Sequence, residues 1–348
     1  MTAQQSGPAT TLQIDGGPAY AWTEPWNQWL GARTEHESTA WIHSGIAVTA
    51  SGDVVVVGHD RTDAYVLGQD GSVRTTFDTG VTQGHGLLAS RWQGQEVLWI
   101  ADNGARRERD AHGEYANHDG SAPPAAVLLS LTGERLMTLT APALDAYRTG
   151  RYRPTGIAVD DADDGTGDVW VADGYGENLV HRFRSDGSYV MSLTGLEGAG
   201  RFDCPHAVWI DRRHDAPELY VSDRVNQRLQ VFDLAGRFKR VVGDASYFRR
   251  PSAFTVVGGL LVVADLESRL TVLDEDDALL GHLGSDDDAA GRPGFPNQLD
   301  HEHRPVRPAA LQPGRFNSPH GLASDSAGNL YVSEFLIGGR LVKLERRT

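Results

Sequence analysis

A short pattern of apolar and polar positions repeats six times along the chain. Each copy begins with a small residue or a histidine and continues with Gly or Ala and two or three apolar residues. After a polar turn, each copy shows a second apolar run. In the third copy these two runs are Thr155–Val159 and Val169–Asp173. The first positions of the six copies are Ser44, His85, Thr155, His206, Ser252 and His320. Six copies of one pattern predict six similar structural units.

Each unit has room for four short antiparallel strands. The second run is usually followed by a third apolar alternation such as Arg228–Phe232, then by an Asp-Gly or Ala-Gly hairpin signal and a fourth strand such as Phe238–Val242. Four strands of this kind form one blade of a β-propeller. They leave no space for helices of ordinary length, which argues against an α/β fold. We therefore expect an all-β, six-bladed propeller that takes up residues 1–348 as a single domain.

The ends of the chain and the spacing of the copies add two expectations. The last copy ends at Thr348 after only three strands. A segment within Thr11–Trp22 is expected to supply the missing strand and close the ring, which removes exposed sheet edges. Two units are enlarged by insertions, at about residues 103–122 and 285–318. Because long loops are often functional, we expect these insertions either to cap one mouth of the central channel or to be disordered.

Composition and charge narrow the range of partners. The chain has 32 Lys and Arg against 47 Asp and Glu, a formal net charge of −15, which repels nucleic acid and anionic lipid. A single cysteine excludes a disulfide-stapled fold. Met1–Pro8 has neither the basic start nor the apolar run of a signal peptide, and no apolar stretch reaches the roughly 20 residues that cross a bilayer. We expect a cytoplasmic protein that acts on a small molecule, and a monomer, because a closed propeller needs no partner.

Histidine occupies the first repeat position in every second copy, at His85, His206 and His320. The first strand of each blade lines the channel, so these side chains would lie about 120° apart at one height and converge on the axis. Three neutral imidazoles with an open fourth position are typical of a catalytic metal site. Zinc is the first expectation, and iron, copper or nickel suit the same ligands. The alternative is that the histidines are packed or solvated residues of the repeat.

Other residues with ligand chemistry fit structural roles. Cys204 lies two residues before His206 and is a fourth ligand, a redox-sensitive neighbour of the metal or, as favoured here, an inert buried thiol. The triplet His301-Glu302-His303 and the segment His112–Asp119 lie in the insertions and are expected to be solvated. Acids recur at the end of the second run whether or not the copy carries a histidine, which favours a turn-capping role. These acids are Asp102, Asp173, Asp223, Asp265 and Glu334.

The repeats and the segments around the three histidines resemble those of a known family. The repeats resemble NHL-type propeller blades. The segments His85-Gly86-Leu87, Asp173-Gly174-Tyr175, Cys204-Pro205-His206 and Ser318-Pro319-His320 resemble the catalytic core of peptidyl-α-hydroxyglycine α-amidating lyase, over about Ser44 to Leu344. The resemblance implies that the three histidines hold zinc and that Tyr175 acts as a base on the substrate hydroxyl. A rim aromatic that packs on its neighbours is the alternative for Tyr175.

The sequence also departs from that family. Where the family has a catalytic arginine in its first blade, this chain has His59, with Arg61 two residues on, and either is a candidate for binding an anionic or carbonyl part of the substrate. The acid that binds a structural calcium in the family is replaced by Gly321, so calcium is doubtful. The family's disulfide in the third blade is absent, since Arg153 and Gly176 stand there.

Together these observations predict a metal-dependent lyase that cleaves a carbon–nitrogen bond at a hydroxylated carbon, as in a carbinolamide or an α-hydroxyglycine, or carries out a related elimination on a small molecule. The alternatives are a metal-dependent hydrolase of an ester or lactone, which uses the same open site, and a non-enzymatic NHL propeller that presents one face to a partner. The changed surroundings of the site favour a related lyase reaction on a different, small substrate over peptide amidation.

Overall fold

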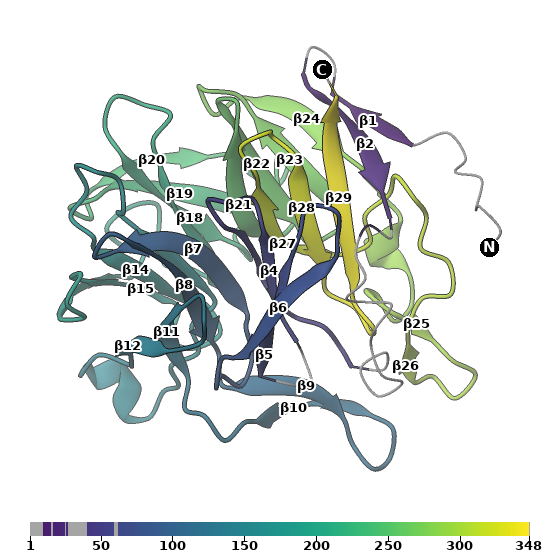
Figure 1. The fold of residues 1–348 in the computed structure, drawn as a ribbon, viewed down its shortest axis with the longest axis horizontal. Coiled ribbons are helices and arrows are strands. Elements are labelled where there is room, and N and C mark those ends of the chain that lie inside the picture. Colours follow the sequence, from purple (N-terminus) through teal and green to yellow (C-terminus); the bar gives the residue numbers. More distant parts are fainter. Residues whose placement is uncertain (1–9, 15–16, 25, 27–39, 59–61, 348) are drawn as a thin grey trace.

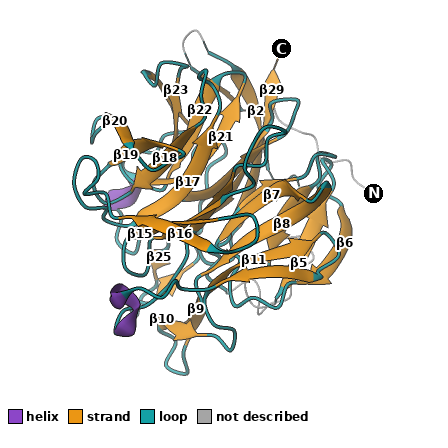
Figure 2. Cartoon of the chain, turned by 90° about the vertical axis from the view of Figure 1, so that its left-hand side faces the viewer, coloured by secondary structure: helices purple, strands orange, loops and turns teal. Residues whose placement is uncertain are grey.

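The computed structural model describes residues 10–14, 17–24, 26, 40–58 and 62–347. Within them the chain forms six antiparallel sheets around a common axis and no α-helix (Figures 1 and 2). The predicted six-bladed β-propeller is confirmed. Among the described residues no helix is long and apolar enough to cross a membrane.

In the first five blades the strands follow sequence order from the channel outwards. Blade 1 consists of β3 (Ile46–Val48), β4 (Val54–Val57), β5 (Asp63–Leu67) and β6 (Val73–Asp78). Blade 2 consists of β7 (Gly86–Trp92), β8 (Gln95–Asp102), β11 (Ala125–Ser130) and β12 (Arg135–Leu139). Blade 3 consists of β13 (Gly156–Val159), β14 (Val169–Asp173), β15 (Leu179–Phe183) and β16 (Tyr189–Leu193). Blade 4 consists of β17 (Pro205–Asp211), β18 (Glu218–Asp223), β19 (Arg228–Asp233) and β20 (Phe238–Val242). Blade 5 consists of β21 (Pro251–Val257), β22 (Leu260–Asp265), β23 (Arg269–Leu273) and β24 (Leu279–Leu283).

Blade 6 joins the two ends of the chain. Its inner strands are β27 (Pro319–Ser324), β28 (Leu330–Glu334) and β29 (Arg340–Arg347), and the N-terminal strands β2 (Ala19–Thr23) and β1 (Thr11–Gln13) continue the sheet outwards. Strand β2 pairs antiparallel with β29, as Figure 1 shows for the purple and yellow strands. The predicted closure is confirmed, and the N-terminal segment contributes two strands instead of one.

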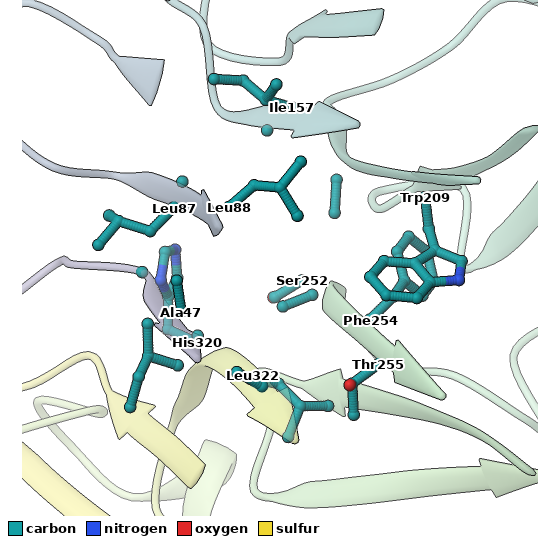
Figure 3. A pocket seen from close by; sticks show the side chains of 18 of the residues that line it. Ala47, Leu87, Leu88, Ile157, Trp209, Ser252, Phe254, Thr255, His320 and Leu322 are labelled. Carbon is teal, nitrogen blue, oxygen red and sulfur yellow. The ribbon is translucent and has the colours of Figure 1, made fainter. Parts of the chain in front are cut away.

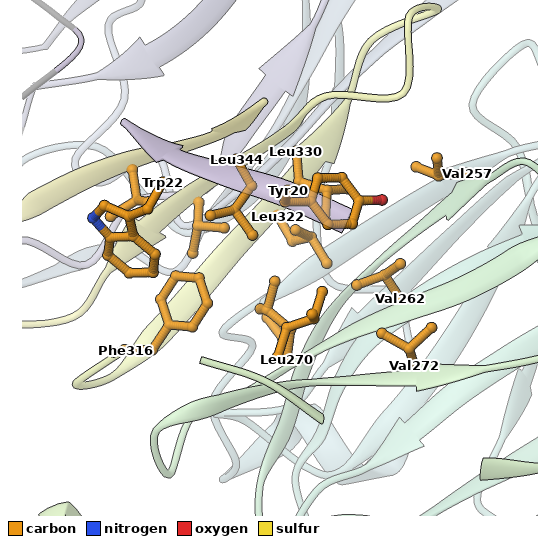
Figure 4. Packing of buried hydrophobic residues seen from close by; sticks show 14 of the residues in the cluster. Tyr20, Trp22, Val257, Val262, Leu270, Val272, Phe316, Leu322, Leu330 and Leu344 are labelled. Atoms are coloured by element: carbon orange, nitrogen blue, oxygen red, sulfur yellow. The ribbon is translucent and has the colours of Figure 1, made fainter. Parts of the chain in front are cut away.

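The hydrophobic core lies between neighbouring blades. Every residue of β14 is buried because both faces of a blade pack against other blades. Figure 4 shows one such contact, in which Leu270 and Val272 of blade 5 face Leu322 and Leu330 of blade 6. Tyr20 from β2 joins this cluster, so the closing strand is held by apolar burial as well as by its ladder of hydrogen bonds.

The inner strands of neighbouring blades contact one another around the whole channel. The second repeat position is where they come closest. A Cβ atom added to Gly86 would lie 2.5 Å from the carbonyl oxygen of Thr155, and one added to Gly156 would lie 2.9 Å from that of His206. Only Gly or Ala occupies this position in the six blades, because the backbone of the next blade takes the space of a larger side chain. The channel is therefore narrow at the level of the histidines.

Both insertions lie at the end of the propeller where the inner strands begin (Figures 1 and 2). The first carries the hairpin β9 (Ala105–Arg109) and β10 (Tyr115–Asp119), and the second carries the 3-10 turn η2 (Ala289–Gly291) and the short pair β25 (Gln298–Leu299) and β26 (Pro305–Val306). A second 3-10 turn, η1 (Asp145–Arg148), leads into blade 3. The hairpin is tied to the rim by an ion pair between Asp119 and Arg153, 2.5 Å apart.

The narrow ring makes a prediction for Gly86→Ala. The added methyl group would collide with the Thr155 carbonyl, and we expect a loss of stability of about 1–3 kcal/mol, as for other overpacked sites. Gly291→Ala is the matched control, because a Cβ atom there meets nothing within 4 Å. Thermal and denaturant unfolding of both variants would measure the difference. Equal stabilities would show that the inner strands can move apart at no cost.

Candidate metal centre

The three histidines of the repeat converge on the channel axis. His85, His206 and His320 stand at the start of inner strands β7, β17 and β27, in blades 2, 4 and 6. Their ring centroids lie 4.8 Å (85–206), 4.7 Å (85–320) and 5.0 Å (206–320) apart, which is close to an equilateral triangle. Their exposed fractions are only 1–3%. The alternation seen in the sequence thus brings the three imidazoles together at one height.

Backbone carbonyls of the intervening blades orient two of these rings. His85 Nδ1 lies 2.7 Å from the carbonyl oxygen of Thr155, and His206 Nδ1 lies 2.8 Å from that of Ser252. A carbonyl can only accept, so each Nδ1 donates and each Nε2 keeps its lone pair. Nε2 of His85 and Nε2 of His320 are buried without a hydrogen-bond partner within the described part of the chain. Fixed tautomers with inward lone pairs are typical of metal ligands.

A fourth histidine joins the cluster. The ring of His43 lies 4.5 Å from that of His85 and 4.4 Å from that of His320, and the four side chains can place one nitrogen each within 4.8 Å of one another. The sequence analysis missed His43 because it stands one residue before Ser44, the aligned position of blade 1. The available signal was its position just before the inner strand β3, at the same mouth of the channel.

Burial keeps all four imidazoles uncharged. It lowers the pKa of His85 to about 3, with a smaller downward effect of the Arg224 charge, while the Thr155 carbonyl opposes the shift. Burial also lowers the pKa values of His43, His206 and His320 well below the usual range, and the neighbouring rings and Arg224 add to the effect. Metal ions bind the neutral form of imidazole, so the folded chain presents its ligands ready for binding.

Tyr175 lies directly beside the histidines. Its phenol oxygen is 3.1 Å from His206 Nε2 and 3.2 Å from His43 Nε2, and it accepts a hydrogen bond of 3.1 Å from Arg224. Burial raises the pKa of Tyr175, and the positive charge of Arg224 opposes that rise. The structure therefore places Tyr175 in contact with the histidine cluster, where its ring also packs against those of His43, His85 and His206.

Arg224 is a site residue to which the sequence analysis gave no role. It is 4% exposed, donates to Tyr175 and to Ser252 Oγ (3.2 Å), and forms no ion pair with a carboxylate of the described residues. A buried guanidinium without a carboxylate is costly, and it favours an anion in its place, such as a phenolate or a substrate group. Its place directly after the acid Asp223, in the turn that follows β18, is the signal that could have found it.

The recurring acids hold the chain in front of each histidine, which confirms their turn-capping role. Asp102 accepts from the backbone N–H of Thr82 (2.7 Å) and Gln83 (3.0 Å), just before His85. Asp223 accepts from Asp203, and Glu334 accepts from Asn317 and Ser318 in the same way. These charge-assisted bonds fix the direction in which the chain enters the inner strand.

The remaining candidates lie apart from the cluster or outside the described residues. The thiol of Cys204 interacts with Arg224, burial raises its pKa, and Cys204 is not among the four clustered ligands. His301 pairs with Glu302 at the surface. His112 and His118 are exposed. A Cβ atom on Gly321 would lie 2.4 Å from Ser333 Oγ, so no acidic side chain fits where the amidating-lyase family binds calcium. His59 and Arg61 lie outside the described residues.

An aromatic layer covers the cluster on the side of the insertions. Phe335 stacks 4.4 Å from the ring of His43, and Trp41 lies 5.3 Å from both Phe335 and Tyr115 of the β9–β10 hairpin. The guanidinium of Arg107 in β9 lies 4.4 Å above the Trp41 ring. The first insertion thus contacts the aromatic residues that pack against the histidines.

A cavity of about 230 Å³ extends along the channel from the histidines. Its walls combine apolar side chains, among them Leu88, Trp209, Phe254 and Leu322 in Figure 3, with polar groups in nearly equal share, and the three channel histidines stand among them. Tyr175 and Arg224 are not among its walls. The cluster therefore lies between this cavity on one side and Tyr175 and Arg224 on the other.

Comparisons with known proteins agree with this architecture. No family model matches the chain. It is 28% identical to NHL repeat-containing protein 3 of Mus musculus over 239 residues, 66% of this chain and 63% of that protein, and 28% identical to the Homo sapiens protein over 216 residues, 60% of this chain and 57% of that protein. It is 24% identical to peptidylglycine alpha-amidating monooxygenase of Rattus norvegicus over 189 residues, 52% of this chain and 17% of that protein. These proteins are homologues, and the chain spans less than two thirds of their length.

Solved structures with the same fold include two enzymes. A streptogramin B lyase aligns with a TM-score of 0.57 at 13% identity, over 94% of this chain and 98% of that one. A gluconolactonase from Xanthomonas campestris aligns with a TM-score of 0.55 at 17% identity, over 99% of both chains. At these identities the likeness shows the propeller fold alone.

The cluster makes a prediction for metal content. The purified protein, loaded with zinc or iron and then dialysed, is expected to keep about one metal ion per chain. A variant with His85→Ala, His206→Ala and His320→Ala is expected to keep none while still folding. His282→Ala is the matched control, because His282 is half-buried and lies outside the cluster. Elemental analysis and circular dichroism would measure both properties. Equal metal content in the triple variant would rule out this centre.

Proposed function

We propose that the chain is a metal-dependent lyase that cleaves the carbon–nitrogen bond at a hydroxylated carbon of a small substrate. The observation that carries the proposal is the position of the Tyr175 oxygen, which lies within hydrogen-bond distance of His206 and Arg224 beside three converging imidazoles. This arrangement combines a site for a Lewis acid with a side chain able to take a proton.

The donor set fits a transition metal. His85, His206 and His320 would hold it, since their rings are neutral and buried and Nε2 of His85 and Nε2 of His320 have no hydrogen-bond partner among the described residues. Imidazole ligands suit zinc, iron, copper and nickel, with zinc the first choice for a three-histidine catalytic site. When bound, the metal would make a coordinated hydroxyl group of the substrate more acidic.

Tyr175 is proposed as the base. The guanidinium of Arg224 has no carboxylate partner and would stabilise the phenolate, which lowers the cost of ionising a buried phenol. The phenolate takes the hydroxyl proton of a carbinolamide, the electron pair of that O–H bond forms the carbonyl, and the carbon–nitrogen bond breaks. The nitrogen takes up the proton and leaves as an amide, so an amide and an aldehyde are the two products.

The surroundings of the cluster support this chemistry. The layer of Phe335, Trp41 and Tyr115 limits the access of water, which strengthens the electrostatic contacts inside and protects the aldehyde-forming step. Homology to an amidating monooxygenase, and the shared fold with a streptogramin B lyase, are consistent with a lyase reaction.

A hydrolase of an ester or lactone is the second candidate, favoured by the full-length fold match to a gluconolactonase. The same metal would then activate water in place of a substrate hydroxyl. The two reactions are told apart by their substrates. Turnover of N-acyl-α-hydroxyglycines to an amide and glyoxylate supports the lyase, and turnover of gluconolactone or aryl esters alone supports the hydrolase.

Tyr175→Phe tests the proposed base. Removal of the phenol oxygen is expected to lower turnover of N-acyl-α-hydroxyglycines by about 10²–10⁴-fold, the usual contribution of a general base, with the metal still bound. Tyr189→Phe is the control, since Tyr189 is an exposed tyrosine of the same blade. A chromatographic assay for the amide product, with elemental analysis of each variant, gives both readouts. Normal turnover of Tyr175→Phe would exclude it as the base.

Arg224→Met tests whether the guanidinium and the phenol act as a unit. We expect a loss of turnover similar to that of Tyr175→Phe, and the double variant is expected to be no slower than the slower single variant. Arg224→Lys, which keeps the charge and loses the planar fork, is expected to retain part of the activity. Losses that multiply in the double variant would mean that the two residues act independently.

A further inference from the structure

We propose that His43 is a fourth imidazole ligand of the metal, so that an ion that binds more than four ligands, such as Fe²⁺, Co²⁺ or Ni²⁺, keeps a position for substrate that four-coordinate zinc would lack. The inference rests on the proposed function only in that both require a metal at the histidine cluster. It differs from the three-histidine site predicted by the repeat and by the family resemblance, because His43 lies outside the repeat register.

The position of His43 is that of a ligand. Its ring lies 4.5 Å from that of His85 and 4.4 Å from that of His320, closer than the three channel histidines lie to one another. One nitrogen of each of the four rings lies within 4.8 Å of the others. If each of the four nitrogens moved inward by up to about 1 Å, all four would reach one ion with bonds of about 2.0–2.1 Å.

The backbone around His43 is held by the two blades that carry its nearest histidines. The N–H of Ile42 donates to the carbonyl of Leu336 in blade 6 (3.0 Å), and the N–H of Gly45 donates to the carbonyl of Gly84 in front of blade 2 (3.0 Å). A bridge between Trp41 and Ile337 adds a second tie to blade 6. His43 is therefore positioned by the same framework that positions His320 and His85, as expected of a preorganised ligand.

The hydrogen bonds around His43 leave the lone pair of one of its ring nitrogens unused. His206 Nδ1 donates to the Ser252 carbonyl, so His206 Nε2 accepts and takes the single proton of the Tyr175 phenol. The neutral ring of His43 carries one N–H and one lone pair, and its contact with the Tyr175 oxygen can use only the N–H. In the metal-free chain this leaves the lone pair of His43 Nδ1 without a described donor. A metal ion would replace the Tyr175 proton at His206 Nε2, and His43 would then have a lone pair to offer the same ion.

A fourth imidazole changes which metal can support catalysis. Four protein ligands around zinc complete its tetrahedron, which is typical of closed structural sites. Ions that accept five or six ligands keep a position for substrate beside four imidazoles, and imidazole suits iron and nickel as well as zinc. No carboxylate is part of the cluster of described residues, so the full positive charge of a divalent ion would remain available to polarise a hydroxyl group.

X-ray absorption spectroscopy of the cobalt-loaded wild-type protein tests the proposal. Multiple scattering from imidazole rings counts the histidine ligands directly, and we expect four together with at least one oxygen ligand. His43→Phe keeps a ring against Phe335 and removes the ligand nitrogens. That variant is expected to show three imidazoles and to bind Co²⁺ more than 100-fold more weakly, because losing a ligand costs more than the 10–100-fold typical of an outer partner.

His43→Ala adds a rescue experiment. Free imidazole is expected to enter the space left by the side chain and to restore the fourth ring in the absorption spectrum. His282→Phe is the control, since this half-buried histidine lies outside the cluster, and it is expected to leave both the spectrum and the affinity unchanged. If the variants at position 43 do not fold, the ligand count of the wild-type protein decides the question alone.

The outcomes separate this inference from the lyase proposal. Three imidazoles in the wild-type spectrum, with unchanged Co²⁺ affinity in His43→Phe, would overturn the role of His43 and leave the lyase proposal standing. Four imidazoles in a protein that turns over no carbinolamide would support His43 and overturn the lyase. A wild-type protein that binds neither Co²⁺, Fe²⁺ nor Zn²⁺ after loading would overturn both.

Discussion

The close approach of neighbouring inner strands at the second repeat position is the constraint on which the rest of the structure depends. Gly86 and Gly156 leave no room for a side chain beside the next blade. This spacing lets a histidine ring at the preceding position reach a carbonyl of the neighbouring blade and still meet the other rings on the axis. Packing between blades, the width of the channel and the geometry of the candidate site therefore follow from one steric condition.

The candidate site differs from the rest of the described structure in that its buried charge has no carboxylate partner. Elsewhere buried arginines are paired, as Arg340 is with Glu334 and Arg213 is with Asp277. Arg224 is equally buried and has a phenol and a hydroxyl group as its partners instead of a carboxylate. Imidazole nitrogens that accept no hydrogen bond, and a guanidinium without an anionic partner, cost folding free energy in an interior without water. Such uncompensated groups, gathered at one point, are typical of sites that are completed by a ligand.

The sequence predicted what local patterns encode and missed what tertiary packing adds. Alternating apolar runs and hairpin signals gave the six blades, and the missing last strand gave the closure, because both depend on short-range periodicity. The register of the repeat gave His85, His206 and His320. His43 was missed because it precedes the aligned position, and Arg224 received no role because only the packing of the turn after β18 brings it to Tyr175. Neither contact can be predicted from the periodicity of the sequence.

The hydrogen bonds that orient the histidine rings join unlike blades, and this alternation limits how the number of blades can change in evolution. Each runs from a blade with a histidine to the next blade, whose Thr155 or Ser252 supplies only a backbone carbonyl. Blades with and without a channel histidine alternate three times around the ring. Gain or loss of one blade by duplication or deletion would place two blades of the same kind side by side and break the even spacing of the histidines around the axis. Blade number in this lineage is therefore expected to change in steps of two wherever the site is retained.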